Sequence, residues 1–95
     1  MAAYVIAQIH ITDPTLYEEY RKLVPPTLEK YGGRFIIRGG KVETLEGNWQ
    51  PQRLVVLEFE SVERAKQWYN SPEYTKAREI RQKASTGNVI MVEGV

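Results

Sequence analysis

Hydrophobic and polar residues alternate over several short stretches of this chain. The clearest case runs from Tyr4 to Ile11, where every second residue is apolar and the residues between them are of mixed character. Strict alternation is typical of a strand, and a mixed second face indicates a strand that is partly buried on both sides. Similar runs predict further strands over residues 34–38, 53–60 and 88–93.

Two glycine pairs flank the second predicted strand, one at residues 32–33 and one at residues 39–40. Glycine reaches positive φ without a Cβ clash, so the first pair is expected to end a helix. The second pair is expected to bend or bulge the strand, which we predict to continue over residues 41–46. A turn at Thr86 and Gly87 is expected to lead into the last strand.

Apolar residues with helical spacing predict helices in the two long intervals between strands. Asp13 can cap the first helix, and Pro14 fits its first position because no partner is available there for an N–H. The prolines at residues 25–26 interrupt this helix, and we expect a kink or two helical pieces. Ser61 and Ser71 are expected to cap a short helix and its continuation.

The order of these elements is β-α-β-β-α-β, which is the ferredoxin-like arrangement. It predicts an α+β fold: a four-stranded antiparallel sheet in the spatial order 4-1-3-2, with both helices on one face. The 95 residues have room for one modest core, so we expect a single domain over residues 1–95.

The alternation in each strand predicts which side chains face the helices. The helix-facing set is entirely apolar: Val5, Ala7, Ile9, Ile11, Phe35, Ile37, Val55, Leu57, Phe59, Ile90 and Val92. The opposite set also contains large apolar residues, namely Ile6, Ile36, Leu54, Val56, Val89 and Met91. Leaving these six exposed would forgo about 10 kcal/mol of burial. Something must therefore cover this second face.

A second copy of the chain is the expected cover, because the sequence has no spare element for that purpose. The predicted assembly is a homodimer that forms sheet to sheet. The interface candidates are Tyr4, Ile6, Gln8, Ile36, Leu54, Val56 and Met91.

Composition narrows the range of functions. The 13 Lys and Arg residues nearly balance the 12 Asp and Glu residues, and the net charge of +1 gives no field for nucleic acid or an anionic membrane. Without cysteine, and with one histidine, the chain lacks the residues for disulfides, thiolate chemistry or a multi-histidine metal site, although carboxylates could bind a hard cation. No apolar run approaches a membrane span, and no signal peptide is evident. We expect a cytoplasmic protein and assign it no metal or cofactor.

Polar residues on the second sheet face offer candidate chemistry. Glu58 and Glu93 are predicted to lie beside Tyr4, with Arg34 close to Glu58. Burial raises a carboxyl pKa, so these groups could act in acid–base catalysis; pairing with arginines at a dimer rim is the alternative. Histidine is the residue type whose ordinary pKa lies near neutrality, so His10 could be a general base, an axial haem ligand or a hydrogen-bonded interface residue.

Aromatic residues gather on the predicted helices. They could line an apolar pocket between helices and sheet, with phenols as polar groups, or simply pack the core. The pocket candidates are Tyr17, Tyr20, Trp68, Tyr69 and Tyr74. His10, Asp13 or Arg38 would supply its polar chemistry. The glycine pairs do not follow a strand and open a helix, so they do not form a dinucleotide-binding loop.

Several short motifs are distinctive: Ala3-Tyr4-Val5-Ile6-Ala7, Thr12-Asp13-Pro14, Tyr31-Gly32-Gly33-Arg34-Phe35, Arg38-Gly39-Gly40 and Trp68-Tyr69-Asn70-Ser71-Pro72-Glu73-Tyr74. Together they resemble domain-of-unknown-function family 1330 over nearly the whole chain. The resemblance implies the dimeric α+β barrel group, which includes cofactor-free monooxygenases, muconolactone isomerase and haem-dependent chlorite dismutases. Pockets in that group commonly lie between sheet and helices, but the family itself has no established activity to carry over.

Two functions are consistent with the sequence. The first is binding of a small apolar or aromatic metabolite, with a cofactor-free monooxygenase- or isomerase-like reaction as its enzymatic form. The second is a non-catalytic dimeric module, in which the polar residues serve capping and the interface. A cavity with inward polar groups favours the first function, and a filled core favours the second, because the fold alone does not distinguish them.

Overall fold

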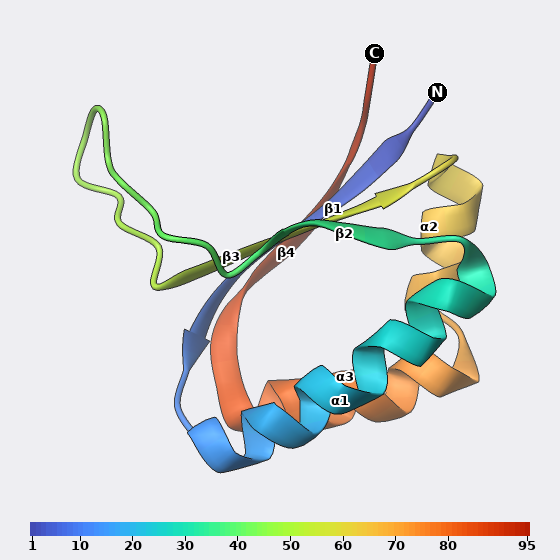
Figure 1. The fold of residues 1–95 in the computed structure, drawn as a ribbon, viewed down its shortest axis with the longest axis horizontal. Coiled ribbons are helices and arrows are strands. Elements are labelled where there is room, and N and C mark those ends of the chain that lie inside the picture. Colours follow the sequence, from blue (N-terminus) through green and yellow to red (C-terminus); the bar gives the residue numbers. More distant parts are fainter.

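The computed structural model describes residues 1–95 and shows a twisted sheet with helices against it (Figure 1). The strands are β1 (Ala3–Ile11), β2 (Arg34–Arg38), β3 (Arg53–Phe59) and β4 (Ser85–Glu93). The helices are α1 (Pro14–Tyr31), α2 (Val62–Tyr69) and α3 (Pro72–Ala84). All strand pairs are antiparallel in the order β2-β3-β1-β4. The predicted α+β class and ferredoxin-like βαββαβ order are confirmed.

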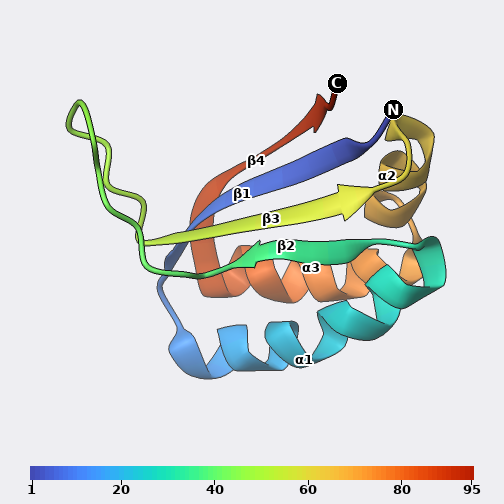
Figure 2. The same cartoon turned by 45° about the horizontal axis from the view of Figure 1, so that its top comes forward.

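All three helices lie on the same side of the sheet, and the other side carries no element of this chain (Figure 2). The two termini lie close together, because Ala3 pairs with Glu93 across β1 and β4. At the opposite end, residues 39–52 form a loop that projects from the sheet (Figures 1 and 2). No helix combines the length and the apolar character that crossing a membrane requires.

Capping side chains start the helices where the sequence predicts. A side-chain oxygen of Asp13 accepts the N–H of Leu16 at 3.1 Å at the start of α1, and Ser71 Oγ accepts the N–H of Tyr74 at 3.1 Å at the start of α3. Gly32 ends α1 with φ 72°, a left-handed conformation that a glycine adopts without strain. These local signals fix the positions of the turns between helices and strands.

Helix α1 continues through Pro25 and Pro26, so the prediction of two separate helical pieces is wrong. A proline cannot donate to the carbonyl four residues earlier, which for Pro25 is the carbonyl of Arg21. Arg38 Nη2 donates to that carbonyl at 3.5 Å and connects β2 to the helix at this point. The helix axis turns toward β2 over its last turns (Figure 2).

Strand β2 ends at Arg38, and the predicted continuation of the strand over residues 41–46 is wrong. Gly39 has φ 71° and directs the chain out of the sheet. The loop then satisfies its polar groups internally: Thr44 Oγ1 donates to the Trp49 carbonyl at 2.7 Å, and Gln50 Nε2 donates to the Val42 carbonyl at 3.1 Å. These bonds take the place of a ladder to β3.

A bulge in β2 changes which side chains face the helices. Phe35 pairs with Leu57, but the register then shifts, so that Ile37 lies opposite Val56 and Arg38 opposite Val55. An extra residue in one strand reverses its alternation beyond the bulge. Arg38 therefore shares the helix side with Val55, and Ile37 lies on the other side, the reverse of the predicted placement.

The alternation predicted for β4 is also wrong by one residue. Met91 pairs with Val5 and Ile90 pairs with Ile6, and residues directly opposite each other share a face. Met91 therefore lies on the helix side, so it is not a candidate for an interface on the opposite face. The physical reason is that residues 89–92 are all apolar, and only pairing with β1 fixes their phase. The strand also begins earlier than predicted, with Thr86 and Gly87 inside it rather than in a turn.

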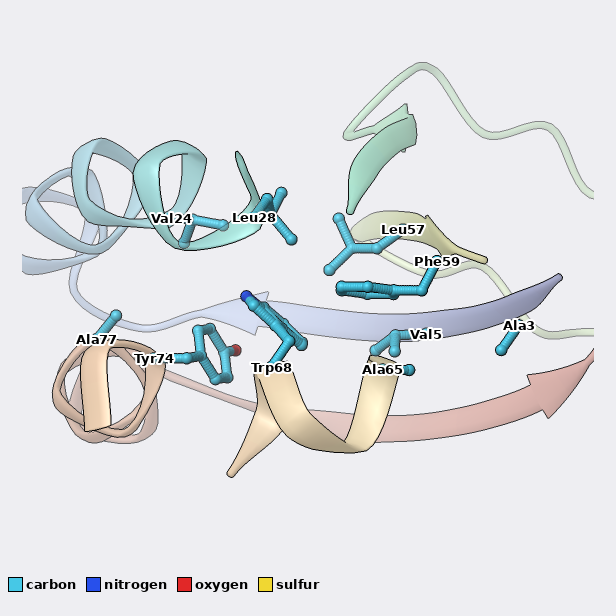
Figure 3. Close-up of a cluster of buried hydrophobic side chains, with 10 residues drawn as sticks. All are labelled: Ala3, Val5, Val24, Leu28, Leu57, Phe59, Ala65, Trp68, Tyr74 and Ala77. Atoms are coloured by element: carbon cyan, nitrogen blue, oxygen red, sulfur yellow. The ribbon is translucent and has the colours of Figure 1, made fainter. Parts of the chain in front are cut away.

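The main core fills the space between helices and sheet, and its buried side chains are Ala3, Val5, Val24, Leu28, Leu57, Phe59, Ala65, Trp68, Tyr74 and Ala77 (Figure 3). Trp68 reaches from α2 toward α1, with its indole nitrogen on the side of Val24 and Leu28 (Figure 3). That nitrogen donates to Thr27 Oγ1 at 3.0 Å, which satisfies its only polar atom inside the core.

Candidate functional site

A cavity of about 40 Å³ lies between the sheet and the helices, and we call it the helix–sheet cavity. Its wall consists of 12 hydrophobic residues and four arginines, contributed by all four strands and all three helices. The arginines are Arg21, Arg38, Arg53 and Arg81. No aspartate or glutamate lines the cavity. The wall is therefore apolar with positive charge and no compensating carboxylate.

Four of the five aromatic pocket candidates line this cavity: Tyr17, Tyr20, Trp68 and Tyr74. The ring centroids of Trp68 and Tyr74 are 3.9 Å apart, and those of Tyr17 and Tyr20 are 5.3 Å apart. Tyr69 faces a separate groove beside β4 instead. The aromatic rings form one continuous wall, because the rings of Tyr20 and Tyr74 also pack edge to face, with their centroids 6.3 Å apart.

Two phenol groups meet at the cavity. The hydroxyl oxygens of Tyr20 and Tyr74 are 2.9 Å apart. Burial raises the pKa of Tyr20 well above its ordinary value of 10.0, and the neighbouring Tyr74 adds to the rise. Burial also raises the pKa of Tyr74, against the opposing charge of Arg81. Both hydroxyls are neutral at pH 7, and since only one can donate to the other, one hydrogen is left for a third group.

Three arginines converge at the end of the cavity where β2 and β3 meet the loop. Arg38 is exposed and lies over the Phe35 ring, with its guanidinium carbon 4.2 Å from the ring centroid. Arg53 lies 5.6 Å from the Tyr17 centroid and packs so closely on Gly39 that a Cβ there would collide with its guanidinium. Arg21 Nη1 pairs with Glu18 at the surface at 3.3 Å.

Arg81 approaches from α3 and is 7% exposed. Its buried Nε has no hydrogen-bond acceptor in the protein, and the same is true of the buried Nε atoms of Arg21 and Arg53. A buried donor that loses its bonds to water and gains none in the protein costs about 1–3 kcal/mol, and more when it is charged. Three such donors around one cavity are the least expected feature of this fold.

The other polar candidates do not lie at the cavity. His10 is exposed and belongs to the set of β1 side chains that point away from the helices. Asp13 caps α1, where its side chain is occupied by the N–H of Leu16. Of the three polar groups proposed for a pocket, only Arg38 is in place. No three or more histidine, aspartate or glutamate side chains come together to form a metal site.

Glu58 lies on the side of the sheet away from the helices, where it accepts a hydrogen bond from Tyr4 Oη at 3.1 Å and one from Arg34 Nε at 2.6 Å. The bond from Arg34, followed by that from Tyr4, lowers the pKa of Glu58 below its ordinary value of 4.5. Of the two alternatives for Glu58, the structure shows pairing with an arginine, and the pKa is not raised because the two donors outweigh desolvation. Glu93 pairs with Ala3 on the helix side and does not join this group.

Residues 2–95 match the family described as Domain of unknown function (DUF1330). The chain belongs to this family. Among curated proteins there is no significant match. DUF1330 membership therefore assigns the whole chain to a family without assigning an activity.

Solved structures share the fold of this DUF1330 protein at low identity. A protein of unknown function from Rhodopseudomonas palustris is 18% identical at a TM-score of 0.78, covering 99% of this chain and 82% of that one. A dimeric protein of unknown function with a ferredoxin-like fold from Bacteroides fragilis is 12% identical at a TM-score of 0.61, covering 98% and 95%. SnoaB, a cofactor-independent oxygenase from Streptomyces nogalater, is 9% identical at a TM-score of 0.58, covering 99% and 93%.

Sequence reasoning missed Arg21 and Arg81 as cavity residues of this DUF1330 chain. The signal was their spacing. Arg21 follows Tyr17 by four residues, and Arg81 follows Ala77 by four, so each arginine occupies the apolar face of its helix. A charged residue in such a stripe marks a place where the core is not purely apolar.

Proposed function

We propose that this protein binds a small organic molecule in the helix–sheet cavity. The observation that carries the proposal is the wall itself, which combines a continuous aromatic surface with a few inward polar groups. Ligand sites typically have this composition: mostly hydrophobic and aromatic residues, with a small number of polar groups that fix orientation. A core that served only stability would not place three arginine Nε atoms without partners around one space.

The size of the cavity limits how such a ligand enters. A volume of about 40 Å³ holds a few atoms, whereas a cavity that accepts benzene measures roughly 150 Å³. An aromatic ligand therefore requires side chains at one end to move outward. Arg38 is exposed and Arg21 is partly exposed, so these two can move without disturbing the core.

A cofactor-free reaction of monooxygenase or isomerase type is the enzymatic form of this proposal. The Tyr20–Tyr74 pair supports it, because a neutral phenol in an apolar site can donate a hydrogen bond to an oxyanion that develops on a substrate. The likeness to SnoaB, described as a cofactor-independent oxygenase, is compatible with such chemistry at the level of the fold.

We infer that the protein forms a homodimer through the outer face of the sheet. This face comprises the register-matched residues Tyr4, Ile6, Ile37, Leu54, Val56, Ile90 and Val92, together with Ile36 in the bulge and Gln8. Ile90 is 57% exposed and Ile36 is 46% exposed in the single chain. An apolar sheet face of this kind is typical of an interaction surface, and a second copy is its simplest partner.

Ligand binding can be tested with a thermal-shift panel of neutral and charged aromatic compounds. A ligand that binds only the folded state raises Tm by mass action. We expect binders to raise the Tm of the wild-type protein, with a smaller rise for Tyr20→Phe, which keeps the ring and loses the hydroxyl. Tyr69→Phe is the matched control and should behave as wild type. Binding that is unaffected by Tyr20→Phe would argue against a site at the Tyr20–Tyr74 pair, and no binder at all would favour the non-catalytic dimeric module.

A further inference from the structure

Positive charge is concentrated around the helix–sheet cavity without a matching negative charge. Four of the seven arginines of the chain line it. The carboxylates that do pair with arginines lie elsewhere: Glu58 with Arg34 on the outer face, and Glu18 with Arg21 at the surface. The other three arginines of the cavity have no salt bridge to any carboxylate.

The hydrogen-bond state of these side chains shows where a partner is missing. The Nε atoms of Arg21, Arg53 and Arg81 are buried, and no protein acceptor reaches them. Arg81 is 7% exposed, so little of its side chain is in contact with bulk water. Guanidinium groups stay charged at all physiological pH values, so neutralisation does not relieve this cost.

Packing alone does not account for all four arginines. Stacking over Phe35 and Tyr17 stabilises Arg38 and Arg53 as cations over aromatic rings. Arg81 has no such ring contact, and it faces the Tyr20–Tyr74 hydroxyl pair. The donors at the cavity therefore include guanidinium N–H groups and the phenol hydrogen left over from the Tyr20–Tyr74 pair. No carboxylate lies beside them to balance the positive charge.

From these contacts, and on the basis of the proposed function, we propose that the ligand is an organic carboxylate, whose carboxylate group is bound by Arg81, Arg53 and the Tyr20–Tyr74 pair. A guanidinium presents two parallel N–H groups that match the two oxygens of a carboxylate. The aromatic wall receives the hydrocarbon part of the ligand. Arg38 and Arg21 close the end of the cavity behind it.

The apolar wall favours a carboxylate on an organic body over a free inorganic oxyanion. Twelve of the 16 lining residues are hydrophobic, and apart from the tyrosine hydroxyls they offer no hydrogen-bond donor to the remaining oxygens of a phosphate. An organic carboxylate has an apolar body that these residues can cover. Burial of that body adds about 25 cal/mol of binding free energy per Å² of apolar surface. Inorganic phosphate would have to leave that surface uncovered.

The test is an NMR titration of the full-length protein that follows the arginine Nε–Hε signals. The probes are benzoate, phenylacetate and cinnamate, each compared with its neutral amide, and inorganic phosphate. We expect at least one carboxylate to shift the Arg81 and Arg53 signals saturably, while its amide leaves them unchanged. Arg81→Gln and Arg53→Gln assign the signals, since each removes one.

Affinity measurements on the same variants separate binding from folding. Loss of one charge-assisted hydrogen bond should weaken carboxylate binding by about tenfold or more for Arg81→Gln and for Arg53→Gln. Arg78→Gln is the matched control on the same helix, because Arg78 contacts the Tyr69 ring and carbonyl outside the cavity. Should Arg81→Gln fail to fold, the partly exposed Arg53 still provides the comparison.

Each outcome decides between the alternatives. Carboxylate binding that both cavity variants weaken and Arg78→Gln does not supports the inference. Equal binding of amide and carboxylate would overturn it and leave the proposed small-molecule function standing. Phosphate binding without carboxylate binding would assign the site to an inorganic oxyanion instead. Absence of any binding by charged or neutral probes would overturn the inference and the proposed function together.

Discussion

Glu58 and Arg81 show how differently two charged residues can be held in one small protein. Glu58 accepts hydrogen bonds from Tyr4 and Arg34, so its negative charge is stabilised by partners within the chain. Arg81 is more deeply buried, and its Nε has no partner within the chain. We interpret the first charge as part of the framework and the second as part of a binding site.

The pairing of Glu58 predicts a specific dependence of stability on pH. Its folded-state pKa is lowered from 4.5, so the folded state binds the proton less readily than the unfolded state. The stabilisation is therefore present above pH 4.5 and is lost as the pH falls through the lower, folded-state pKa. Glu58→Gln should lower Tm at neutral pH, and its difference from wild type should shrink as the pH falls below 4.5.

Thermal unfolding at several pH values measures this effect. Glu60→Gln is the matched control, because Glu60 is an exposed neighbour with no salt bridge. A Tm difference for Glu58→Gln that stays constant from neutral to acidic pH would contradict the assigned role.

At the scale of elements, the junction between α2 and α3 positions the aromatic wall. Ser71 Oγ donates to the Trp68 carbonyl at 2.7 Å and accepts the N–H of Tyr74 at 3.1 Å. One hydroxyl therefore closes α2 and opens α3, and both residues that it joins line the helix–sheet cavity. This buried hydroxyl therefore connects the two helices, together with the Ser71 N–H, which donates to the same Trp68 carbonyl at 3.1 Å.

Ser71→Ala should destabilise the protein by about 1–2 kcal/mol, because it removes the cap and leaves a buried N–H and a buried carbonyl without this partner. Ser61→Ala is the control, since the Ser61 hydroxyl makes only the bond to the Arg64 N–H at the start of α2. Urea unfolding of both variants gives the two free energies. Equal costs for the two serines would show that the junction has no special role.

Sequence patterns predicted the helices and strands better than they predicted which side of the sheet each side chain occupies. Caps such as Asp13 and Ser71 are local, so they could be identified from a few residues. The bulge before Ile37 and the phase of β4 depend on pairing with a distant strand, and no local pattern contains that information. The arginines of the cavity could not be predicted for the same reason. The sequence pattern put Arg38 on the wrong side of the sheet because it does not show the bulge. Arg21 and Arg81 can be recognised as cavity residues only when it is known how each helix packs on the sheet.

At the scale of the molecule, the corrected faces strengthen the prediction of a dimer. Val89 and Met91 leave the outer face, and Ile37, Ile90 and Val92 join it. These three side chains are 41%, 57% and 45% exposed in one chain. The predicted interface is therefore more apolar than the sequence pattern indicated, and it lies on the opposite side of the sheet from the cavity.

Ile90→Glu should dissociate the dimer, because a carboxylate buried among the apolar side chains of the outer face has no partner there. Light scattering coupled to size-exclusion chromatography at micromolar concentration measures the mass. Leu45→Glu is the control, since Leu45 is 90% exposed in the loop and lies outside the outer face. A wild-type protein of monomeric mass would argue against the dimer directly.

The two tryptophans of the chain lie at opposite extremes of exposure. Trp68 is 1% exposed in the core, and Trp49 is 61% exposed in the loop that projects beyond the sheet. The molecule thus contains two intrinsic fluorophores, one for each region. Trp49→Phe leaves an emission that a soluble quencher cannot reach until the core opens. Trp68→Phe leaves a red-shifted emission that reports the surroundings of the loop, so changes at the cavity and changes in the loop can be followed separately without a dye.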